Sequence, residues 1–475
     1  MQLIMIKPMK KSATIILLLL FVMCCSSAMA GGTGHKYLYR LTLKDKRGTP
    51  FSIGKPQAYL SQKAIERRRR QHLDIDSTDL PITPSYIRSI EATGAEVIVK
   101  SKWNNTVLVG IDRASQYKDI QDLPFVASAK KVYTEPEEKK DNDVRDRYHT
   151  ILNQLDTVYD NNYGVAREQI EMVGGLGLHR RGYTGKGMTI AVFDAGFMNA
   201  DRIPALTKIK IEGTHDFLSK DKEDMYRGGS HGTMTLSVIA VNEPGLFIGT
   251  APDATFWLFR CEDDATETSA EEDYWTAAAE FADSVGVDVI SSSLGYHDFD
   301  DKTTSYHYYD QNGHTSLISR TSSMLAGKGI IHVNSAGNDG MGTWKKINFP
   351  SDAEDMLSVG AVTPQGVNAS FSSLGPTADG RVKPDVVALG SPTAVVSGRG
   401  TLTSETGTSF STPVISGMVA CLWQALPDKT AREIIELVRQ SGNNYEHPDN
   451  VYGYGLPDFT KALKQGKHET DAIAP

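Results

Sequence analysis

Short apolar strands alternate with helices through the second half of this chain, and that alternation constrains the fold more than any other feature. A strand that is apolar at every position has to be buried on both faces. Such strands are predicted over 188–193, 255–259, 287–291 and 330–334, with helices over 271–284 and 317–326 between them. The pattern predicts an α/β fold whose mainly parallel sheet has helices on both faces. In such sheets, functional groups gather where the strands end.

Three polar residues stand at such positions. Asp194 follows the first strand, His231 opens an apolar helical segment, and Ser409 lies just ahead of the apolar helix over 414–422. Taken singly, each has an ordinary structural explanation: a turn-forming Asp, a capping or surface His, and an N-cap Ser. Together they supply the parts of nucleophilic catalysis, because a serine hydroxyl attacks only when an imidazole takes its proton and a carboxylate orients that imidazole.

The order Asp, His, Ser separates folds that share this chemistry. An α/β-hydrolase places its Ser first, and a chymotrypsin-type enzyme places its His first. The motifs here are Asp194-Ala195-Gly196, His231-Gly232-Thr233 and Gly407-Thr408-Ser409-Phe410-Ser411-Thr412-Pro413. On these motifs the chain resembles the subtilisin-like serine peptidases, the subtilases, over roughly residues 164–463. The segments 371–377 and 383–388 also resemble that family.

The resemblance implies roles for individual residues. Ser409 would be the nucleophile, His231 the general base and Asp194 the residue that orients it. Asn338 would join the Ser409 N–H in the oxyanion hole, where losing one donor costs about 3 kcal/mol of transition-state stabilisation. The substrate-binding segments implied by the family are Ser293-Leu294-Gly295 and Ser335-Ala336-Gly337. No cofactor or metal is required for this catalysis; structural calcium is found in some subtilases, but its ligands here are not assigned.

Two positions depart from the family pattern. Ala195 stands where a hydroxyl residue is common, which removes a group that could support the Asp194 carboxylate. Phe410 stands where Met is commonest, and this exchange is expected to alter packing under Ser409 without changing the chemistry. The segment 296–315, rich in Asp, His and Tyr, is expected to be an ordinary surface loop, with substrate contact or a cation site as alternatives.

A small α+β domain is expected over 31–133, with strands at 37–42, 96–100 and 106–110 and a helix at 84–90. The run Arg67–Arg70 continues a helical segment and is interpreted as its solvated face. The domain loosely resembles subtilase pro-domains, which implies an intramolecular inhibitor and folding chaperone. A charged linker over 134–160 would be the place where it is removed, although a plain linker that is never cut remains an alternative.

The first thirty residues have the pattern of a secretory signal. Lysines precede the apolar run 15–23, and Ala28-Met29-Ala30 supplies the small residues of a cleavage site. We therefore expect an exported protein, secreted or periplasmic, with no membrane span in its mature chain; lipid attachment at Cys24 is the less favoured alternative. Cys421 is expected to be a buried hydrophobic residue, and a bridge to Cys261 is left open.

The formal net charge of −8 gives no electrostatic indication of nucleic-acid binding. The expected organisation is a signal peptide (1–30), a small domain (31–133), a linker (134–160), a catalytic domain (161–463) and a polar tail (464–475). The resulting hypothesis is an exported serine endopeptidase, made as a zymogen, that acts on polypeptides. The alternative is a catalytically silent subtilase fold that serves as a binding or scaffold protein.

Overall fold

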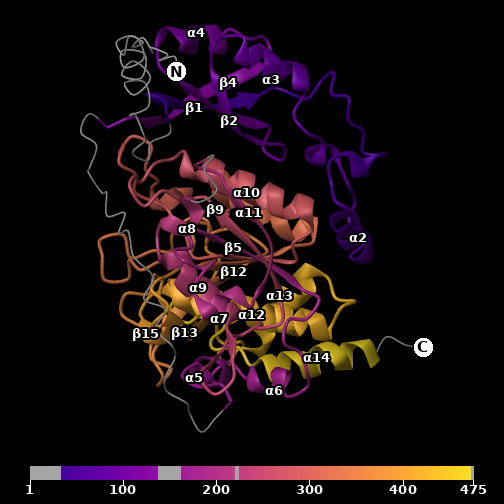
Figure 1. Cartoon of the computed structure of the whole chain (residues 1–475), viewed down its shortest axis with the longest axis vertical. Coiled ribbons are helices and arrows are strands. Elements are labelled where there is room, and N and C mark those ends of the chain that lie inside the picture. Colours follow the sequence, from indigo (N-terminus) through magenta and orange to yellow (C-terminus); the bar gives the residue numbers. More distant parts are fainter. Residues whose placement is uncertain (1–33, 137–161, 220–223, 472–475) are drawn as a thin grey trace, which may run out of the picture.

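The computed structural model describes residues 34–136, 162–219 and 224–471. The predicted signal peptide, and all but the first three residues of the predicted linker, lie outside this description. A small sheet with two helices lies at one end of the molecule, and the larger domain occupies the rest (Figure 1). The two domains are in contact along helix α10 (Glu271–Val285) of the larger domain.

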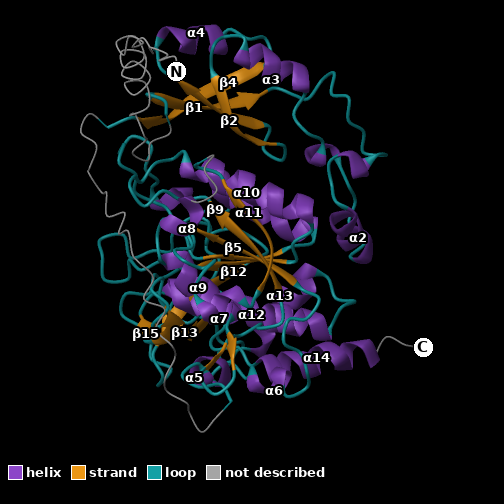
Figure 2. Cartoon of the chain, viewed as in Figure 1, coloured by secondary structure: helices purple, strands orange, loops and turns teal. Residues whose placement is uncertain are grey.

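The larger domain is built on a parallel sheet of seven strands, as the sequence predicts (Figure 2). Every neighbouring pair within it is parallel. The strands lie in the order β13 (Val386–Leu389), β12 (Leu357–Val362), β11 (Ile331–Ser335), β10 (Val289–Ser292), β5 (Thr189–Asp194), β9 (Thr255–Arg260) and β6 (Lys210–Asp216). Strand β5 therefore lies between β10 and β9, and the carboxyl ends of all three meet at one edge of the sheet.

Alternate side chains of β5 enter two different cores. Ile190 and Val192 pack with α9 (His231–Ala240) and α12 (Thr408–Ala425), whereas Ala191 and Phe193 pack with α10 and α11 (Leu317–Leu325). Two further helices, α13 (Ala431–Ser441) and α14 (Phe459–Asp471), add to the first of these cores. Helices thus cover both faces, and the central strands are buried on both sides, whereas the edge strand β6 stays partly exposed.

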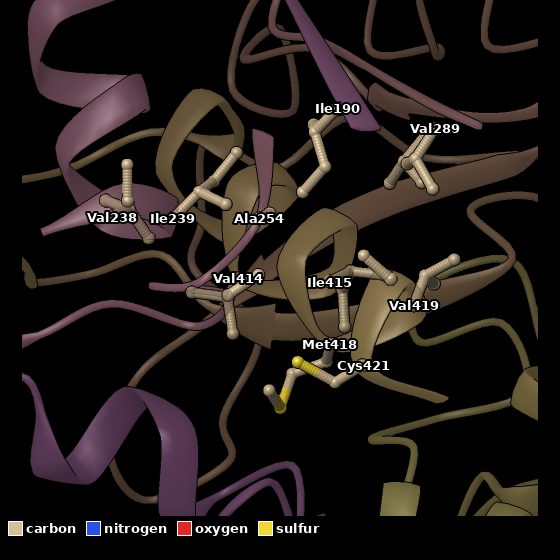
Figure 3. Packing of buried hydrophobic residues seen from close by; sticks show 14 of the residues in the cluster. Ile190, Val238, Ile239, Ala254, Val289, Val414, Ile415, Met418, Val419 and Cys421 are labelled. Atoms are coloured by element: carbon tan, nitrogen blue, oxygen red, sulfur yellow. The ribbon is translucent and has the colours of Figure 1, made fainter. Parts of the chain in front are cut away.

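Helix α12 is the centre of the first core. Val414, Ile415, Met418 and Val419 of this helix pack against residues of the sheet and of α9 (Figure 3). Cys421 follows them and is fully buried, with its Sγ 3.2 Å from the Thr250 carbonyl oxygen, as expected of a small buried hydrophobic residue. Cys421 and Cys261 are both free thiols.

The remaining elements are short and lie around this framework. Two helices differ from the expectation. Helix α14 runs past the expected domain boundary at Leu463, and α12 begins at Thr408 rather than at residue 414, so Pro413 lies inside it. The short elements are α5 (Arg167–Glu171), α6 (Leu176–His179), α7 (Pro204–Thr207), α8 (Asp224–Arg227), β7 (Asn242–Glu243), β8 (Phe247–Ile248), β14 (Thr393–Val396), β15 (Leu402–Glu405) and the 3₁₀ turns Pro56–Ala58, Ser77–Asp79, Tyr308–Asp310 and Ala326–Lys328.

The small domain is an antiparallel sheet that packs on both faces. Its strands lie in the order β2 (Glu96–Ser101), β3 (Thr106–Ile111), β1 (Tyr37–Leu43) and β4 (Val126–Thr134), with helices α2 (Gln62–Arg70), α3 (Pro84–Glu91) and α4 (Ser115–Gln121). Leu41 and Val109 belong to the domain's own core with Ile90 of α3 and Ile120 of α4. Leu38 and Leu108, on the other face, pack with α10 of the larger domain. The small sheet is therefore fully covered only when the larger domain is present.

The interpretation of Arg67–Arg70 as a solvated face is wrong for half of the run. Arg67 and Arg68 are buried, and both pair with the fully buried Asp283 of α10. Arg68 also pairs with Asp79 at 2.9 Å. Charge runs usually stay in water, but here Asp283 of the neighbouring domain and Asp79 of the same domain compensate the cost of burying the guanidinium groups. The sequence could not show those partners, because Asp283 lies more than two hundred residues farther along the chain.

Among the described residues, no helix combines enough length and apolar character to cross a lipid bilayer.

Candidate active site

Asp194 and His231 meet at the carboxyl edge of the sheet. Asp194 is the last residue of β5 and is fully buried, and His231 is the first residue of α9. The Nδ1 atom of His231 lies 2.9 Å from Oδ1 and 3.0 Å from Oδ2 of Asp194. With Nδ1 donating to this carboxylate, Nε2 is left unprotonated and can act as a base.

Two further groups hold the Asp194 carboxylate. The backbone N–H of Ala195 donates to Oδ1 at 2.9 Å, and the hydroxyl of Thr235 lies 3.2 Å from Oδ2. Ala195 itself has no hydroxyl to offer, as the sequence indicates, but Thr235 of α9 supplies one to the Asp194 carboxylate. The signal in the sequence is that Thr235 follows His231 by four residues, which places both on one face of the helix.

Ser409 is the second residue of α12 and is 8% exposed. It lies within the first turn rather than just ahead of the helix. Its hydroxyl donates to the carbonyl oxygen of Ser293 over a long 3.4 Å. The ring of the next residue, Phe410, lies 5.7 Å from the His231 ring, centroid to centroid, so the start of α12 lies directly beside the imidazole. The aromatic residue in place of Met thus packs against the predicted base.

Pro413 and Ser293 together fix the backbone of Ser409. A proline inside a helix has no N–H to donate to the carbonyl four residues earlier, which here is the carbonyl of Ser409. The hydroxyl of Ser293 donates to that carbonyl at 2.9 Å. Ser293, assigned by resemblance to the substrate edge, therefore also completes the hydrogen bonding of the helix that carries Ser409.

Asn338 is anchored to the same helix. Its Oδ1 accepts from the backbone N–H of Thr408 at 2.9 Å and from the Thr408 hydroxyl at 3.0 Å. Asn338 is exposed, so its Nδ2 donors remain available beside Ser409. The preceding Gly337 has φ of 110°, and a Cβ there would lie 2.8 Å from the Ser373 hydroxyl, which explains the glycine. Sequence reasoning missed the anchoring role of Thr408, although the residue lies within the predicted motif.

The charges around His231 favour its protonated form. Burial lowers the pKa of His231, but the Asp194 carboxylate, and more weakly Glu262 and Asp264, outweigh burial and raise this pKa to about 9. An imidazolium formed during a reaction is thereby stabilised. The resting imidazole, in turn, is fully available as a base only at alkaline pH.

The predicted substrate edge follows β10. Leu294 accepts from the Asn334 amide at 2.9 Å, which fixes the loop. Among the described residues, neither the N–H nor the C=O of Gly295 has a hydrogen-bond partner, so this backbone can pair with an extended peptide. Ser335 and Ala336, in contrast, are buried, and the backbone of Ala336 is bonded to Val359 and Asn348. These two residues can line a pocket but have no backbone group to offer.

The segment 296–315 is more than a surface loop. Tyr309 is 69% exposed, but Tyr296 and Phe299 are fully buried and belong to the core beneath α10. Tyr296 and Phe349 also exchange backbone hydrogen bonds of 2.9 and 3.0 Å. The expectation of an ordinary surface loop holds only for its tip.

Comparison with known proteins agrees with this geometry. Residues 185–455 match the model of the Subtilase family, Peptidase_S8, and residues 38–147 match the Peptidase S8 propeptide domain of Bacteroidota. Similar proteins include Subtilisin NAT of Bacillus subtilis subsp. natto (27% identical, covering 60% of this chain and 68% of that protein) and Mycosin-1 of Mycobacterium tuberculosis (29%, covering 62% and 72%). Another is Subtilisin-like protease SBT6.1 of Arabidopsis thaliana, 31% identical over 56% of this chain but only 24% of that protein.

The family match covers more than half of the chain, and it includes Asp194, His231, Asn338 and Ser409 in the positions described above. The small domain is covered by a propeptide model of the same family. The chain therefore belongs to the subtilase family of serine endopeptidases and carries a subtilase propeptide domain ahead of its subtilase domain.

Proposed function

We propose that this protein is an exported endopeptidase, made as a zymogen, that hydrolyses polypeptides through Ser409, His231 and Asp194. The observation that carries the proposal is the Asp194–His231 pair beside the first turn of α12, where Ser409 lies. Export is supported by the signal pattern of residues 1–30. Polypeptides are the natural substrates because the free backbone of Gly295 can add an extended chain to the edge after β10.

The reaction follows from these positions. The Ser409 hydroxyl rotates from the weak Ser293 contact toward His231, passes its proton to Nε2 and attacks the scissile carbonyl carbon. The bond between this carbon and the leaving nitrogen then breaks, and His231 returns the proton to that nitrogen. Water, deprotonated by the same imidazole, then attacks the acyl carbon. The bond between this carbon and Ser409 Oγ breaks, and His231 returns the proton to Oγ. Asp194 keeps its charge throughout and stabilises the imidazolium.

The oxyanion formed at attack needs donors already in place. The Ser409 N–H points out of the first turn of α12, where the positive end of the helix dipole also lies. The Asn338 Nδ2 is the second donor, held by the two bonds from Thr408 to Oδ1. Donors fixed before the reaction cost no reorganisation when the charge appears.

The small domain is proposed to inhibit the enzyme and assist its folding until it is cut away between residues 134 and 160. The match to a propeptide model supports this role. So do its contacts with α10: Arg40 of β1 pairs with Asp273 at 2.7 Å, and Glu280 accepts from the backbone N–H groups of Lys102 and Trp103 at 2.7 and 2.9 Å.

Active-site labelling with a fluorophosphonate probe tests the proposal. The processed protein should be labelled on Ser409, and the Ser409→Ala protein should be neither labelled nor active. Intact-mass measurement should also show that Ser409→Ala retains the small domain that the wild type loses. A folded wild type that takes up no label would support the alternative of a catalytically silent binding protein. Normal processing of Ser409→Ala would exclude autocatalytic maturation.

A further inference from the structure

Three glutamates gather just beyond the end of β9. Glu262 lies two residues after Arg260, the last residue of β9, which stands opposite Asp194 in the strand register. Glu271 is the first residue of α10. Glu267 lies in the loop between them. Each offers a carboxylate oxygen, and the three oxygens lie within 4.8 Å of one another. The cluster belongs to the same sheet edge as the catalytic pair but contains none of its residues.

The charges of the three carboxylates are not balanced by any ion pair within the part of the chain that the structure describes. In the described part of the chain, none of them forms an ion pair with Lys, Arg or His. The neighbouring acidic residues of α10 differ in this respect, since Glu272 and Asp273 both pair with Arg40. Three like charges this close repel one another strongly unless a cation or protons compensate them.

Two buried polar atoms beside the cluster have no hydrogen-bond partner among the described residues. Glu271 is 1% exposed, and while its Oε1 accepts from the Thr268 N–H at 3.0 Å, its Oε2 is buried without a hydrogen-bond partner. Independently, the hydroxyl of Tyr296 is fully buried without a partner, and it lies close enough to Glu262, Glu267 and Glu271 to be affected by their charges. Buried polar atoms are rarely left unpaired unless a water or ion completes them.

The backbone holds the cluster in place. The N–H of Glu267 donates to the Asp300 carboxylate at 3.1 Å, and the N–H of Asp300 donates to the Glu267 carbonyl at 2.8 Å. Asp300 belongs to the same inserted segment as Tyr296. The loop before α10 and the segment 296–315 thus surround the three carboxylates from two sides.

We propose that Glu262, Glu267 and Glu271 bind one Ca²⁺ ion, with the Tyr296 hydroxyl donating to a water in the shell of that ion. The donors are all oxygen, which hard divalent cations prefer. Two ligands on opposite sides of Ca²⁺, each about 2.4 Å away, are about 4.8 Å apart, so one ion can contact all three carboxylates. Mg²⁺ spans only about 4.2 Å and requires a near-ideal octahedron, which fits the cluster less well. The ion would join the loop before α10 to the inserted segment, and none of its ligands belongs to the proposed triad.

Terbium luminescence tests the site directly, because Tb³⁺ replaces Ca²⁺ and is excited through nearby aromatic residues. The full-length Ser409→Ala protein, which cannot digest itself, is stripped with EDTA and titrated with Tb³⁺ and then with competing Ca²⁺. A saturable signal that Ca²⁺ displaces is expected. This signal should be lost when Glu271→Gln is added to the Ser409→Ala protein. Adding Glu267→Gln instead should lower the affinity for Tb³⁺ at least tenfold. Glu267 lies at the solvent side of the cluster, so this change should leave the fold intact.

The matched control is Glu243→Gln, which removes a carboxylate that already pairs with Lys208 and should leave Tb³⁺ binding unchanged. Thermal unfolding gives a second measurement: saturating Ca²⁺ should raise the Tm of the Ser409→Ala protein and raise it less when Glu267→Gln is added, because a ligand stabilises only the state that binds it. Equal Tb³⁺ affinity in all variants, or an equal rise in Tm, would overturn the proposal. Absence of any binding at neutral pH would overturn it too, and would mean that protons alone compensate the cluster.

Discussion

At the scale of single residues, the site depends on groups that hold the reacting ones. Thr235 and the Ala195 N–H fix the Asp194 carboxylate, and Thr408 fixes the Asn338 amide. Each is a short polar contact in a largely buried setting, where an ordered hydrogen bond is worth more than in water. Mutation of these residues should therefore change the rate more than the binding of substrate.

Asn338 and Thr408 give the first test of this idea. Asn338→Ala should lower kcat by about a hundredfold or more with KM nearly unchanged, because the donor acts on the transition state. Thr408→Val keeps the backbone bond to Asn338 but removes the hydroxyl, so a loss of about fivefold in kcat is expected from one hydrogen bond of roughly 1 kcal/mol. Steady-state kinetics on a peptide substrate measure both, and a loss confined to KM would contradict the assignment.

The pH dependence should reflect the raised pKa of His231. His231 acts as a base only when neutral, and its pKa of about 9, raised from 6.5 chiefly by Asp194, keeps it protonated at lower pH. Activity should therefore rise with pH, and the midpoint of kcat/KM should lie well above 6.5. Asp264→Asn removes one of the charges that raise this pKa and should move the midpoint to lower pH. A midpoint at or below 6.5 in the wild type would contradict the assigned electrostatics.

At the scale of elements, the start of α12 is stabilised from outside the helix. Pro413 leaves the Ser409 carbonyl without its helical donor, and Ser293 of the neighbouring loop replaces it. The helix that carries the proposed nucleophile and the proposed substrate edge are thereby joined at Ser409 itself. Any displacement of the edge loop should therefore be transmitted to Ser409.

A double-mutant cycle measures this coupling. Ser293→Ala leaves a buried carbonyl unpaired and should lower the free energy of unfolding by about 1–3 kcal/mol. Pro413→Ala restores the N–H that can bond to the same carbonyl. In the Pro413→Ala background the cost of Ser293→Ala should thus be much smaller, as measured by urea unfolding of Ser409→Ala proteins. Additive effects of the two changes would show that the Ser293 hydroxyl does not replace the missing helical donor.

At the scale of the whole molecule, buried charges join the two domains. Arg40, Arg67 and Arg68 of the small domain meet Asp273 and Asp283 of α10. Breaking a buried pair leaves an uncompensated charge, which costs far more than the loss of an exposed pair. We therefore expect the small domain of the Ser409→Ala protein, which cannot degrade it, to stay bound after the linker is cut.

Gel filtration of a cut protein tests this expectation. A specific protease site placed between residues 137 and 160 of the Ser409→Ala protein allows the linker to be opened, and the two parts should still elute together. Arg68→Ala should weaken their association at least thirtyfold, since losing one member of a buried charge pair costs 2 kcal/mol or more. Arg69→Ala is the control, because Arg69 is exposed and, within the described ranges, forms its ion pair with Glu66 of its own helix alone. Equal retention of both variants would show that the buried pairs do not hold the domains together.

Strong local patterns in the chain predicted much of this molecule. The runs of apolar residues that form β5, β9, β10 and β11 have to be buried on both faces, so the parallel α/β sheet could be predicted from them. The catalytic motifs are contiguous, and their order along the chain distinguishes subtilases from other serine hydrolases. Asp194, His231 and Ser409 could be named for these reasons.

Contacts between distant segments could only come from the tertiary structure. Because Asp283 pairs with Arg67 and Arg68, two of the four arginines are buried rather than exposed. The Ser293 hydroxyl, in turn, donates the hydrogen bond that Pro413 cannot donate. Glu262, Glu267 and Glu271 have no metal-binding spacing in the sequence, yet the turn before α10 brings their carboxylates together under Tyr296. The sequence by itself determined the sheet and the family, because both depend on local pattern. The partners of the buried charges and the surroundings of the unpaired polar atoms were decided only by folding, because they depend on which distant segments meet.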